Sequence, residues 1–82
     1  MKQSVSVVLR NQEDALVRLM GVFYRRGYVI ESLSMVPGQG DNVRLMADVS
    51  CNELEAAQLL RHVAKLVDVV ATEVLPCEIL QQ

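Results

Sequence analysis

The chain has 82 residues, of which 51% are hydrophobic and only 4% aromatic, and its formal net charge is −2. This length fits one domain and leaves no room for a second. The weakly acidic balance argues against nucleic acid as a partner, and no apolar run approaches the roughly 20 residues that span a membrane. The aliphatic excess on so small a domain predicts that part of its surface is buried against another chain.

The two cysteines and the single histidine give no sign of a metal or redox site. Cys51 and Cys77 lie far apart, without CxxC spacing or neighbouring histidines, so we expect a reduced pair. His62 falls within a predicted helix and is expected at the surface or on the helix flank. Residues Met1–Ser4 lack the long apolar core of a secretory signal. The sequence thus predicts a cytoplasmic protein that holds no metal or cofactor.

The first two predicted elements are a strand over Ser4–Arg10 and a helix that ends at Arg26. Polar and apolar residues alternate along the strand, with Val8 as the one exception. Asn11 is the predicted N-cap of the helix, and the acidic residues after it fall in the first turn. Gly27 suits the helix end, because glycine tolerates the left-handed conformation. The apolar residues at helical spacing are Ala15, Leu16, Leu19, Met20, Val22 and Phe23.

A second strand is predicted over Tyr28–Val36, but its apolar residues do not keep to one face. The break in alternation indicates either a β-bulge near Glu31 and Ser32 or a strand that is buried on both faces. The sequence leaves both alternatives open. Residues 37–41, which read PGQGD, then form a turn by composition.

The second half of the chain repeats the strand and helix order. A strand with clean alternation covers 42–50, a helix follows with Asn52 as its N-cap, and a last strand covers Asp68–Leu75. Pro76 is expected to end that strand, so residues 1–76 form the predicted domain and 77–82 a short tail. The predicted apolar stripe of the helix is Ala56, Leu60, Val63, Ala64 and Val67.

The predicted order is β-α-β-β-α-β, which is typical of the ferredoxin-like α+β fold. Right-handed crossovers place both helices on one face of a four-stranded antiparallel sheet with the strand order 4-1-3-2. The strand over residues 28–36 is then an edge strand. An apolar edge strand favours pairing with another chain, so the sequence predicts a homodimer through this edge.

Several functions of this fold do not match the sequence. An RNA-binding module needs exposed aromatic residues on the central strands, and the strands over 4–10 and 42–50 contain none. A metal chaperone needs paired cysteines in the loop that here begins at Asn11. No acid–base pair or nucleophile is placed for catalysis, so an enzyme is not expected. A small-molecule sensor or a regulatory subunit remains.

The stretch LRNQEDALVRLMGVFYRRGYVIESLSMVP resembles the regulatory small subunit of acetolactate synthase. That family typically reads N-x-x-G-A-L-x-R-x-x-G-L-F-x-x-R-G-Y-N-I-E-S-L-x-x-x-P, and KLVDV at residues 65–69 matches a second family motif. The resemblance implies an ACT domain, a ferredoxin-like module that often binds amino acids. The matching residues of the first motif are Asn11, Ala15, Leu16, Arg18, Gly21, Phe23, Arg26, Gly27, Tyr28, Ile30, Glu31, Ser32, Leu33 and Pro37.

The resemblance also implies a binding site for a branched-chain amino acid, usually valine, at a dimer interface. The effector lies between the loop before the first helix of one chain and the second strand of the other. Asn11, Ala15, Leu16 and Ile30 carry over as candidate effector contacts. Their alternative roles are structural, as N-cap for Asn11 and as core packing for the others. A helix N-terminus suits the effector carboxylate, because it offers free N–H groups and a positive dipole end.

Two departures from the family oppose effector binding. Asp14 stands where the family has glycine, and it places a negative charge where a ligand carboxylate should bind. Val29 stands where the family has asparagine, so a side-chain amide is lost. Loss of one such polar contact costs on the order of 1–3 kcal/mol. We therefore expect a weak or absent valine response, with Asp14 as a stand-in for the effector carboxylate.

The implied partner is the large catalytic subunit, which uses thiamine diphosphate, magnesium and a flavin, none of which this chain is expected to hold. The candidate contact surface is the turn over Gly38–Asp41 together with the exposed side of the sheet. Two hypotheses follow from the sequence. The chain is a non-catalytic regulatory subunit of acetolactate synthase, or it is a stand-alone ACT-domain sensor that regulates another protein.

Overall fold

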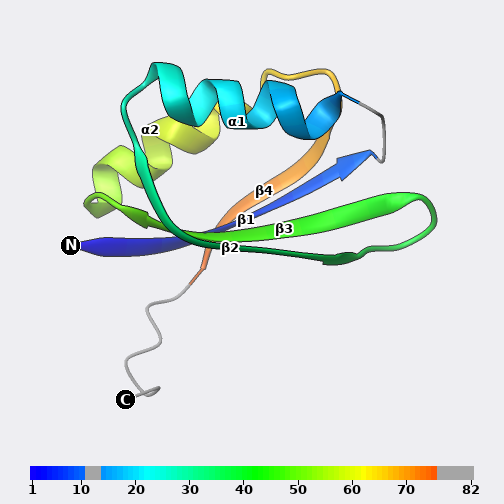
Figure 1. Cartoon of the computed structure of the whole chain (residues 1–82), viewed down its shortest axis with the longest axis horizontal. Helices are drawn as coiled ribbons and strands as arrows, with labels where there is room; N and C mark the ends of the chain where they lie inside the picture. The colour runs from blue at the N-terminus through cyan, green and yellow to red at the C-terminus, as the bar shows by residue number, and fades with distance from the viewer. Residues whose placement is uncertain (11–13, 76–82) are drawn as a thin grey trace, which may run out of the picture.

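The computed structural model describes residues 1–10 and 14–75. Their element order confirms the predicted β-α-β-β-α-β pattern (Figure 1). The predicted ends of the elements are correct to within a few residues. The elements are β1 (Lys2–Arg10), α1 (Ala15–Arg25), β2 (Val29–Pro37), β3 (Asn42–Ser50), α2 (Glu53–Val63) and β4 (Val69–Leu75).

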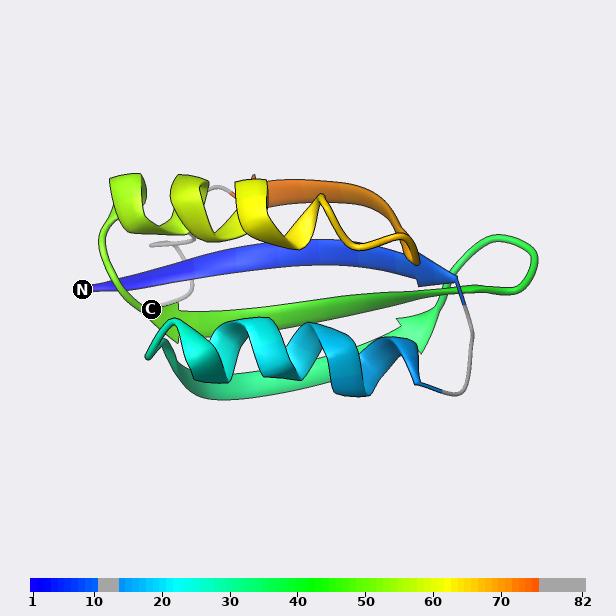
Figure 2. The ribbon, with the colours of Figure 1, turned by 90° about the horizontal axis from the view of Figure 1, so that it is seen from above.

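The four strands form one antiparallel sheet with the order β2-β3-β1-β4, so β2 is an edge strand as predicted. Both helices cover the same face, and the other face, here called the open face, carries no helix from the described residues (Figure 1). Seen from above, α1 lies along the β2 side of the sheet and α2 along the β4 side (Figure 2). This arrangement confirms the ferredoxin-like prediction.

The hydrophobic core lies between the sheet and the two helices. The alternating residues of β1 and β3 that point toward the helices are fully buried, as the period-two pattern predicts. Phe23 and Leu19 of α1 and Leu59 of α2 are the large, fully buried side chains that the helices contribute to the core. The strand residues of the core are Val5, Val7, Leu9, Leu45, Ala47 and Val49.

A β-bulge interrupts β2, which confirms one of the two sequence alternatives. Ile30 pairs with Val49 and Ser32 pairs with Asp48, so Glu31 is the extra residue. The other alternative, a strand buried on both faces, is wrong because every residue from Glu31 to the end of β2 is exposed. The bulge restores one parity to the rest of the strand, and it explains why the apolar residues changed face.

The beginning of α1 corrects one prediction. The N-cap position belongs to Asp14, whose carbonyl oxygen accepts the first helical hydrogen bond from the Arg18 amide at 3.0 Å. Asp14 therefore lies before the first turn and not within it, and the first turn holds no acidic residue. Asn11, the predicted N-cap, lies outside the described residues.

The end of α1 agrees with the sequence. Gly27 has a φ of 76°, which is the left-handed conformation that glycine adopts without strain. Its amide donates to the carbonyl of Tyr24 at 3.1 Å, and the amide of Tyr28 donates to the carbonyl of Phe23 at 3.0 Å. This pair of bonds is a Schellman motif, which satisfies the last carbonyls of the helix and turns the chain into β2.

The second helix confirms its predicted start and corrects its predicted stripe. The Asn52 side chain accepts from the Glu55 amide at 2.8 Å, and the Glu55 carboxylate accepts from the Asn52 amide at 3.0 Å. Ala64 and Val67 are exposed because α2 ends at Val63, before either could complete the stripe. The buried residues of α2 are Ala56, Leu59, Leu60 and Val63. The predicted strand end at Pro76 and the tail 77–82 lie outside the described residues.

Candidate functional site

The first group of predicted effector residues gathers at the N-terminal end of α1. Asp14 is exposed, Ala15 is buried at 3% exposure, and Leu16 is half-buried against the core. Asn11, the fourth member, lies outside the described residues. The burial of Ala15 and the contact of Leu16 with the core agree with their alternative structural role. Asp14 alone of these three presents an exposed side chain at this end of the helix.

The second group, Val29 and Ile30, lies at the opposite end of α1, where β2 begins. Val29 is 61% exposed, and Ile30 is half-buried against the core. The 11 residues of α1 separate the two groups by roughly 16 Å at about 1.5 Å per residue. One amino-acid ligand cannot contact both groups within one chain. A site that used both groups would need a second copy of the protein.

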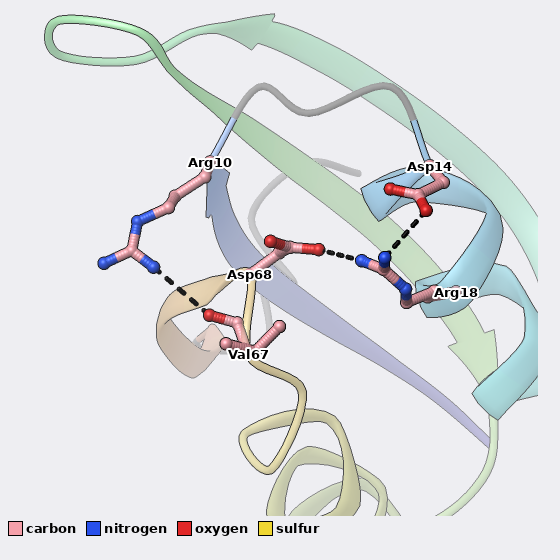
Figure 3. A network of polar contacts seen from close by, with 5 residues as sticks. All are labelled: Arg10, Asp14, Arg18, Val67 and Asp68. Atoms are coloured by element: carbon pink, nitrogen blue, oxygen red, sulfur yellow. Dashed lines mark hydrogen bonds and ion pairs between the residues drawn. The ribbon is translucent and has the colours of Figure 1, made fainter.

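A polar network surrounds the N-terminal end of α1 (Figure 3). The Arg18 guanidinium pairs with the carboxylate of Asp14 at 2.7 Å and also donates to the carboxylate of Asp68, whose side chain is 13% exposed. Arg10 donates from its side chain to the Val67 carbonyl at 3.2 Å and from its amide to the Asp68 carbonyl at 2.9 Å. The network thus ties the start of α1 and the end of β1 to the turn before β4.

The sequence reasoning assigned no contact at this site to Arg10, Arg18 or Asp68. Arg18 follows Asp14 by four residues, which is the spacing of a helical ion pair, so that half of the network was readable. Asp68 lies 50 residues beyond Arg18 in the chain, and no local pattern indicates this contact. Because Arg18 already binds two carboxylates, its charge is largely compensated before any ligand arrives. An anionic ligand at this helix end would meet the Asp14 carboxylate.

Apolar side chains on α1 and β2 form a surface beside the sheet edge. Arg18 faces the turn between α2 and β4, so Leu16 and Met20, two residues away on either side, lie on the opposite side of the helix, toward β2. Leu33 and Met35 pair with Ala47 and Leu45 of the buried face, and each is 44% exposed. We call Leu16, Met20, Leu33 and Met35 the edge patch.

The open face carries a polar cluster that joins three strands. The Asp48 carboxylate of β3 accepts from the Ser4 hydroxyl of β1 at 2.6 Å and from the Ser32 hydroxyl of β2 at 2.8 Å. These two hydrogen bonds hold the pKa of Asp48 below its ordinary value, because they favour the ionised form. The cluster therefore stabilises the β2-β3-β1 part of the sheet at neutral pH.

A depression of about 620 Å³ lies beside the turn between β2 and β3. Apolar side chains of β1, β2 and β4, such as Val8, Val36 and Ala71, line it together with the exposed Arg44 of β3. The predicted contact surface consists of the turn over Gly38–Asp41 and the open face, and the depression lies where these two parts adjoin. Its combination of an apolar lining with one cation suits a protein partner with an apolar residue next to a carboxylate.

His62 and Cys51 have structural surroundings. His62 is half-buried on α2, where its Nδ1 lies 3.1 Å from Nη2 of Arg26, so it lies on the helix flank as predicted. Desolvation and the neighbouring Arg26 lower the pKa of His62. Burial raises the pKa of the Cys51 thiol. In residues 1–10 and 14–75 no group of three or more His, Cys, Asp or Glu side chains could hold a metal ion, and no helix could cross a membrane.

Comparisons with known proteins agree with the fold and with the sequence motifs. A family model described as an ACT domain matches residues 11–72. The acetolactate synthase isozyme 3 small subunit of Escherichia coli strain K12 is 37% identical over 71 residues, which are 85% of this chain and 44% of the relative. The acetolactate synthase small subunit of Buchnera aphidicola from Schizaphis graminum is 34% identical and covers 85% of this chain and 45% of its own. This chain thus spans a little under half the length of these relatives.

Solved structures show the same fold. The acetolactate synthase small subunit of Thermotoga maritima aligns with a TM-score of 0.84 at 24% identity, covering 90% of this chain and 47% of that one. The ACT domain of a GTP pyrophosphokinase from Chlorobium tepidum aligns with a TM-score of 0.77 at 13% identity, covering 92% and 97%. At these identities the likeness supports the fold alone, and the two proteins differ in their named functions.

Proposed function

This chain belongs to the ACT domain family, and from that premise we propose that it is a non-catalytic regulatory subunit of an acetolactate synthase. The observation that carries the proposal is the 37% identity over 71 residues to a protein of that name. In this role the chain binds and activates a large catalytic subunit in branched-chain amino acid biosynthesis, in the cytoplasm. Thiamine diphosphate, magnesium and a flavin would belong to that partner.

We propose that the chain acts as a homodimer joined through β2. The support is the combination of a strand edge that pairs with no other strand of the described residues and the edge patch beside it. Unpaired backbone groups of an edge strand readily bind another strand, and apolar side chains next to them gain free energy from burial. The same contact would bury part of the exposed aliphatic surface, because Leu33 and Met35 lie at this edge. A monomer of 82 residues would be marginally stable without it.

The dimer also provides the place for an amino-acid effector. In it, the start of α1 from one copy and the start of β2 from the other would enclose the ligand, which agrees with the separation of the two candidate groups within one chain. Asp14 and Val29 stand at these two positions. The charge of Asp14 repels a ligand carboxylate, and Val29 offers no hydrogen bond. We therefore propose that this subunit responds weakly to valine while it keeps the task of activation.

The proposed contact surface for the large subunit is the open face with the turn over Gly38–Asp41. Support comes from the depression beside Arg44, which pairs a cation with an apolar lining. In these proposals the open face contacts the large subunit and the edge patch contacts the second copy. The helices pack on the core. The two partners therefore bind separate surfaces of the molecule.

Co-expression with an acetolactate synthase large subunit from the same genome tests the function. The two chains should purify together, and the synthase activity should rise when this chain is added. Arg44→Glu should lose most of the activation, since it reverses the charge in the depression. Arg61→Glu on the exposed side of α2 is the matched control and should activate normally.

Two results would decide against these proposals. If the two chains neither purify together nor show a rise in activity, the chain is a stand-alone ACT-domain sensor. If wild-type and Arg44→Glu proteins activate equally, the contact surface lies elsewhere on the subunit.

A further inference from the structure

Three side chains with hydrogen-bond donors come together where the end of α1 faces α2. Arg26 is the C-cap of α1, His62 lies in the last turn of α2, and Lys65 follows His62 by three residues. The Lys65 amide donates to the His62 carbonyl at 3.2 Å, which holds these two residues one turn apart. Nη2 of Arg26 lies 3.1 Å from Nδ1 of His62, so the end of α1 reaches across to α2. We call Arg26, His62 and Lys65 the cation cluster.

The contact between Arg26 and His62 fixes the protonation of the imidazole ring. A guanidinium has N–H donors and no acceptor, so Nδ1 of His62 accepts the hydrogen bond and carries no proton. The neutral ring then has its proton at Nε2, where it offers an N–H donor. An imidazolium could not keep this contact, because both of its nitrogens would be donors.

Every charged group that shifts the pKa of His62 is a cation. Desolvation lowers this pKa most, and Arg26, Lys65 and Arg61 lower it further in that order. Arg61 lies about 100° around α2 from His62 and is exposed, so it adds positive charge without joining the contact. The cation cluster therefore favours a neutral imidazole as long as no anion is present.

The acidic side chains of the described part of the chain do not neutralise the cation cluster. No ion pair there involves Arg26 or Lys65. Glu55 lies in the neighbourhood, since both it and Arg26 shift the pKa of Tyr28, but its carboxylate accepts from the Asn52 amide at 3.0 Å. The helix dipole favours cations at helix ends, which accounts for the position of these charges but not for the reach of Arg26 to α2.

We propose that the cation cluster binds a small polyvalent oxyanion. The Arg26 guanidinium, the Lys65 ammonium and the His62 ring N–H are all donors, so a ligand that only accepts hydrogen bonds is the one that fits them. Charge-assisted bonds to such an anion are the strong ones, and a polyvalent anion has enough oxygens to accept from all three groups. The ligand class covers diphosphates and tricarboxylates.

This site is separate from the surfaces discussed so far. Seen from above, the two helices lie side by side over the sheet, so the cation cluster belongs to the helix layer and not to the open face (Figure 2). The proposal goes beyond the regulatory function proposed above. It requires neither a second copy of the chain nor the large subunit.

Anion binding at the cation cluster should be coupled to proton uptake. A negative charge beside an imidazole favours the imidazolium form, so a bound anion raises the pKa of His62. In the chain without ligand this pKa lies below the ordinary value of 6.5. The bound form therefore holds more protons than the unbound form in this pH region, and the affinity should increase as the pH falls through it.

The single histidine of the chain makes the site directly observable. The C–H resonances of His62 report its pKa in a proton NMR titration, and sulfate is a suitable probe because it stays divalent over this pH range. The pKa should be higher in sodium sulfate than in sodium chloride of the same ionic strength, since screening acts equally in both salts. An equal pKa in the two salts would overturn the proposal.

Two neighbouring arginines provide a matched pair of variants. Arg26→Gln should weaken the binding of pyrophosphate at least about tenfold, because a charge-assisted hydrogen bond is lost. Arg25→Gln removes the same charge one residue earlier, but the Arg25 guanidinium lies beside Gly21 and does not shift the pKa of His62, so the Kd should change much less. Isothermal titration calorimetry at constant pH measures both. Equal losses would show a general effect of surface charge and would overturn the site.

His62→Gln tests the coupling to protons. Glutamine keeps an N–H donor but cannot take up a proton, so this variant should bind sulfate with an affinity that no longer increases as the pH falls. The wild-type chain measured in the same buffers is the control. A pH dependence that persists in His62→Gln would overturn the assignment of proton uptake to this residue.

Pyrophosphate and citrate distinguish the two sources of such an anion. Tighter binding of pyrophosphate identifies a phosphate ligand, and tighter binding of citrate identifies a carboxylate ligand. Failure of both to bind would overturn the proposal. Binding of a glutamate-rich peptide in that case would assign the cation cluster to an acidic protein segment instead. Activation of the synthase is measured separately and decides none of these outcomes.

Discussion

Asp14 has two roles at the start of α1, and both depend on one arginine. Its carbonyl accepts the first helical bond from the Arg18 amide, and its carboxylate pairs with the Arg18 guanidinium at 2.7 Å. Arg18 is therefore engaged by this residue twice and by Asp68 once. A change at Asp14 should alter the charge at this helix end with little change in the fold, because glycine replaces an N-cap residue at a cost of only a few tenths of a kcal/mol.

Asp14→Gly should increase the affinity for valine. The substitution removes a carboxylate from the place where the ligand carboxylate is expected, and even about 1.4 kcal/mol of relieved repulsion corresponds to a tenfold lower Kd. Isothermal titration calorimetry of the wild-type chain and the variant measures the difference. Asp14→Asn, which removes the charge but keeps the volume, should gain part of the effect. Equal valine binding by wild type and Asp14→Gly would contradict the proposed site.

Asp48 should make the stability depend on pH. Its folded pKa lies below the ordinary value of 3.8, because the Ser4 and Ser32 hydroxyls stabilise the carboxylate. The stabilisation is therefore complete above the ordinary pKa and is lost as the pH falls through the lower folded pKa. Urea unfolding at neutral pH should show Asp48→Asn to be less stable than wild type, and the difference should shrink at about pH 3. A difference that stays constant over this range would show that the charge of Asp48 is not responsible.

At the level of elements, the connection between the end of α1 and the start of β2 depends on Gly27. Gly27→Ala should lower the free energy of unfolding by about 1–2 kcal/mol, because a Cβ disfavours the left-handed conformation at φ 76°. Gly21→Ala is the matched control, since Gly21 lies inside α1 and a Cβ there meets only the flexible Arg25 side chain at 3.4 Å. It should raise the stability by about 0.5–1 kcal/mol. Urea denaturation compares the two, and equal effects would mean that the φ of Gly27 is not decisive.

The helices and strands could be predicted from the sequence wherever a local pattern of residues indicates them. Alternation predicted β1 and β3, and the Asn52 cap predicted the start of α2, since each signal lies within a few neighbouring residues. The stripe of α2 was read too far, to Val67, because the helix ends at Val63 in a turn that the apolar spacing does not reveal. The bulge in β2 remained one of two alternatives until the pairing with β3 was known.

Less of the candidate site than of the fold could be predicted from the sequence. The resemblance to a family named the positions at both ends of α1, but it did not show that Arg18 joins Asp14 to Asp68. That contact depends on the packing of the turn before β4 against α1, and tertiary packing leaves no local sequence pattern. The edge patch has the same origin. Leu16 and Met20 pack against the core from the β2 side of α1, which the sequence alone does not reveal and the position of Arg18 on the opposite side of the helix shows.

At the scale of the whole molecule, the β2 edge should make the stability depend on protein concentration. Leu33→Lys places a charge in the proposed seam, so this variant should be a monomer with a Tm that does not change with concentration, whereas the wild-type Tm should rise. Leu54→Lys is the matched control, because Leu54 is 64% exposed on α2, away from this edge. Sedimentation and differential scanning calorimetry measure both. A concentration-dependent Tm in Leu33→Lys would place the interface elsewhere.

The strand order also constrains when this chain can fold during its synthesis. β1 is made first, but it lies in the middle of the sheet and pairs with both β3 and β4. While β4 is still within the ribosome, one side of β1 has no partner, and the sheet cannot close around Val5, Val7 and Leu9. Folding should therefore be a late and cooperative event that waits for Leu75 to emerge. Nascent chains that stop before Val69 should stay sensitive to protease, however long they are given.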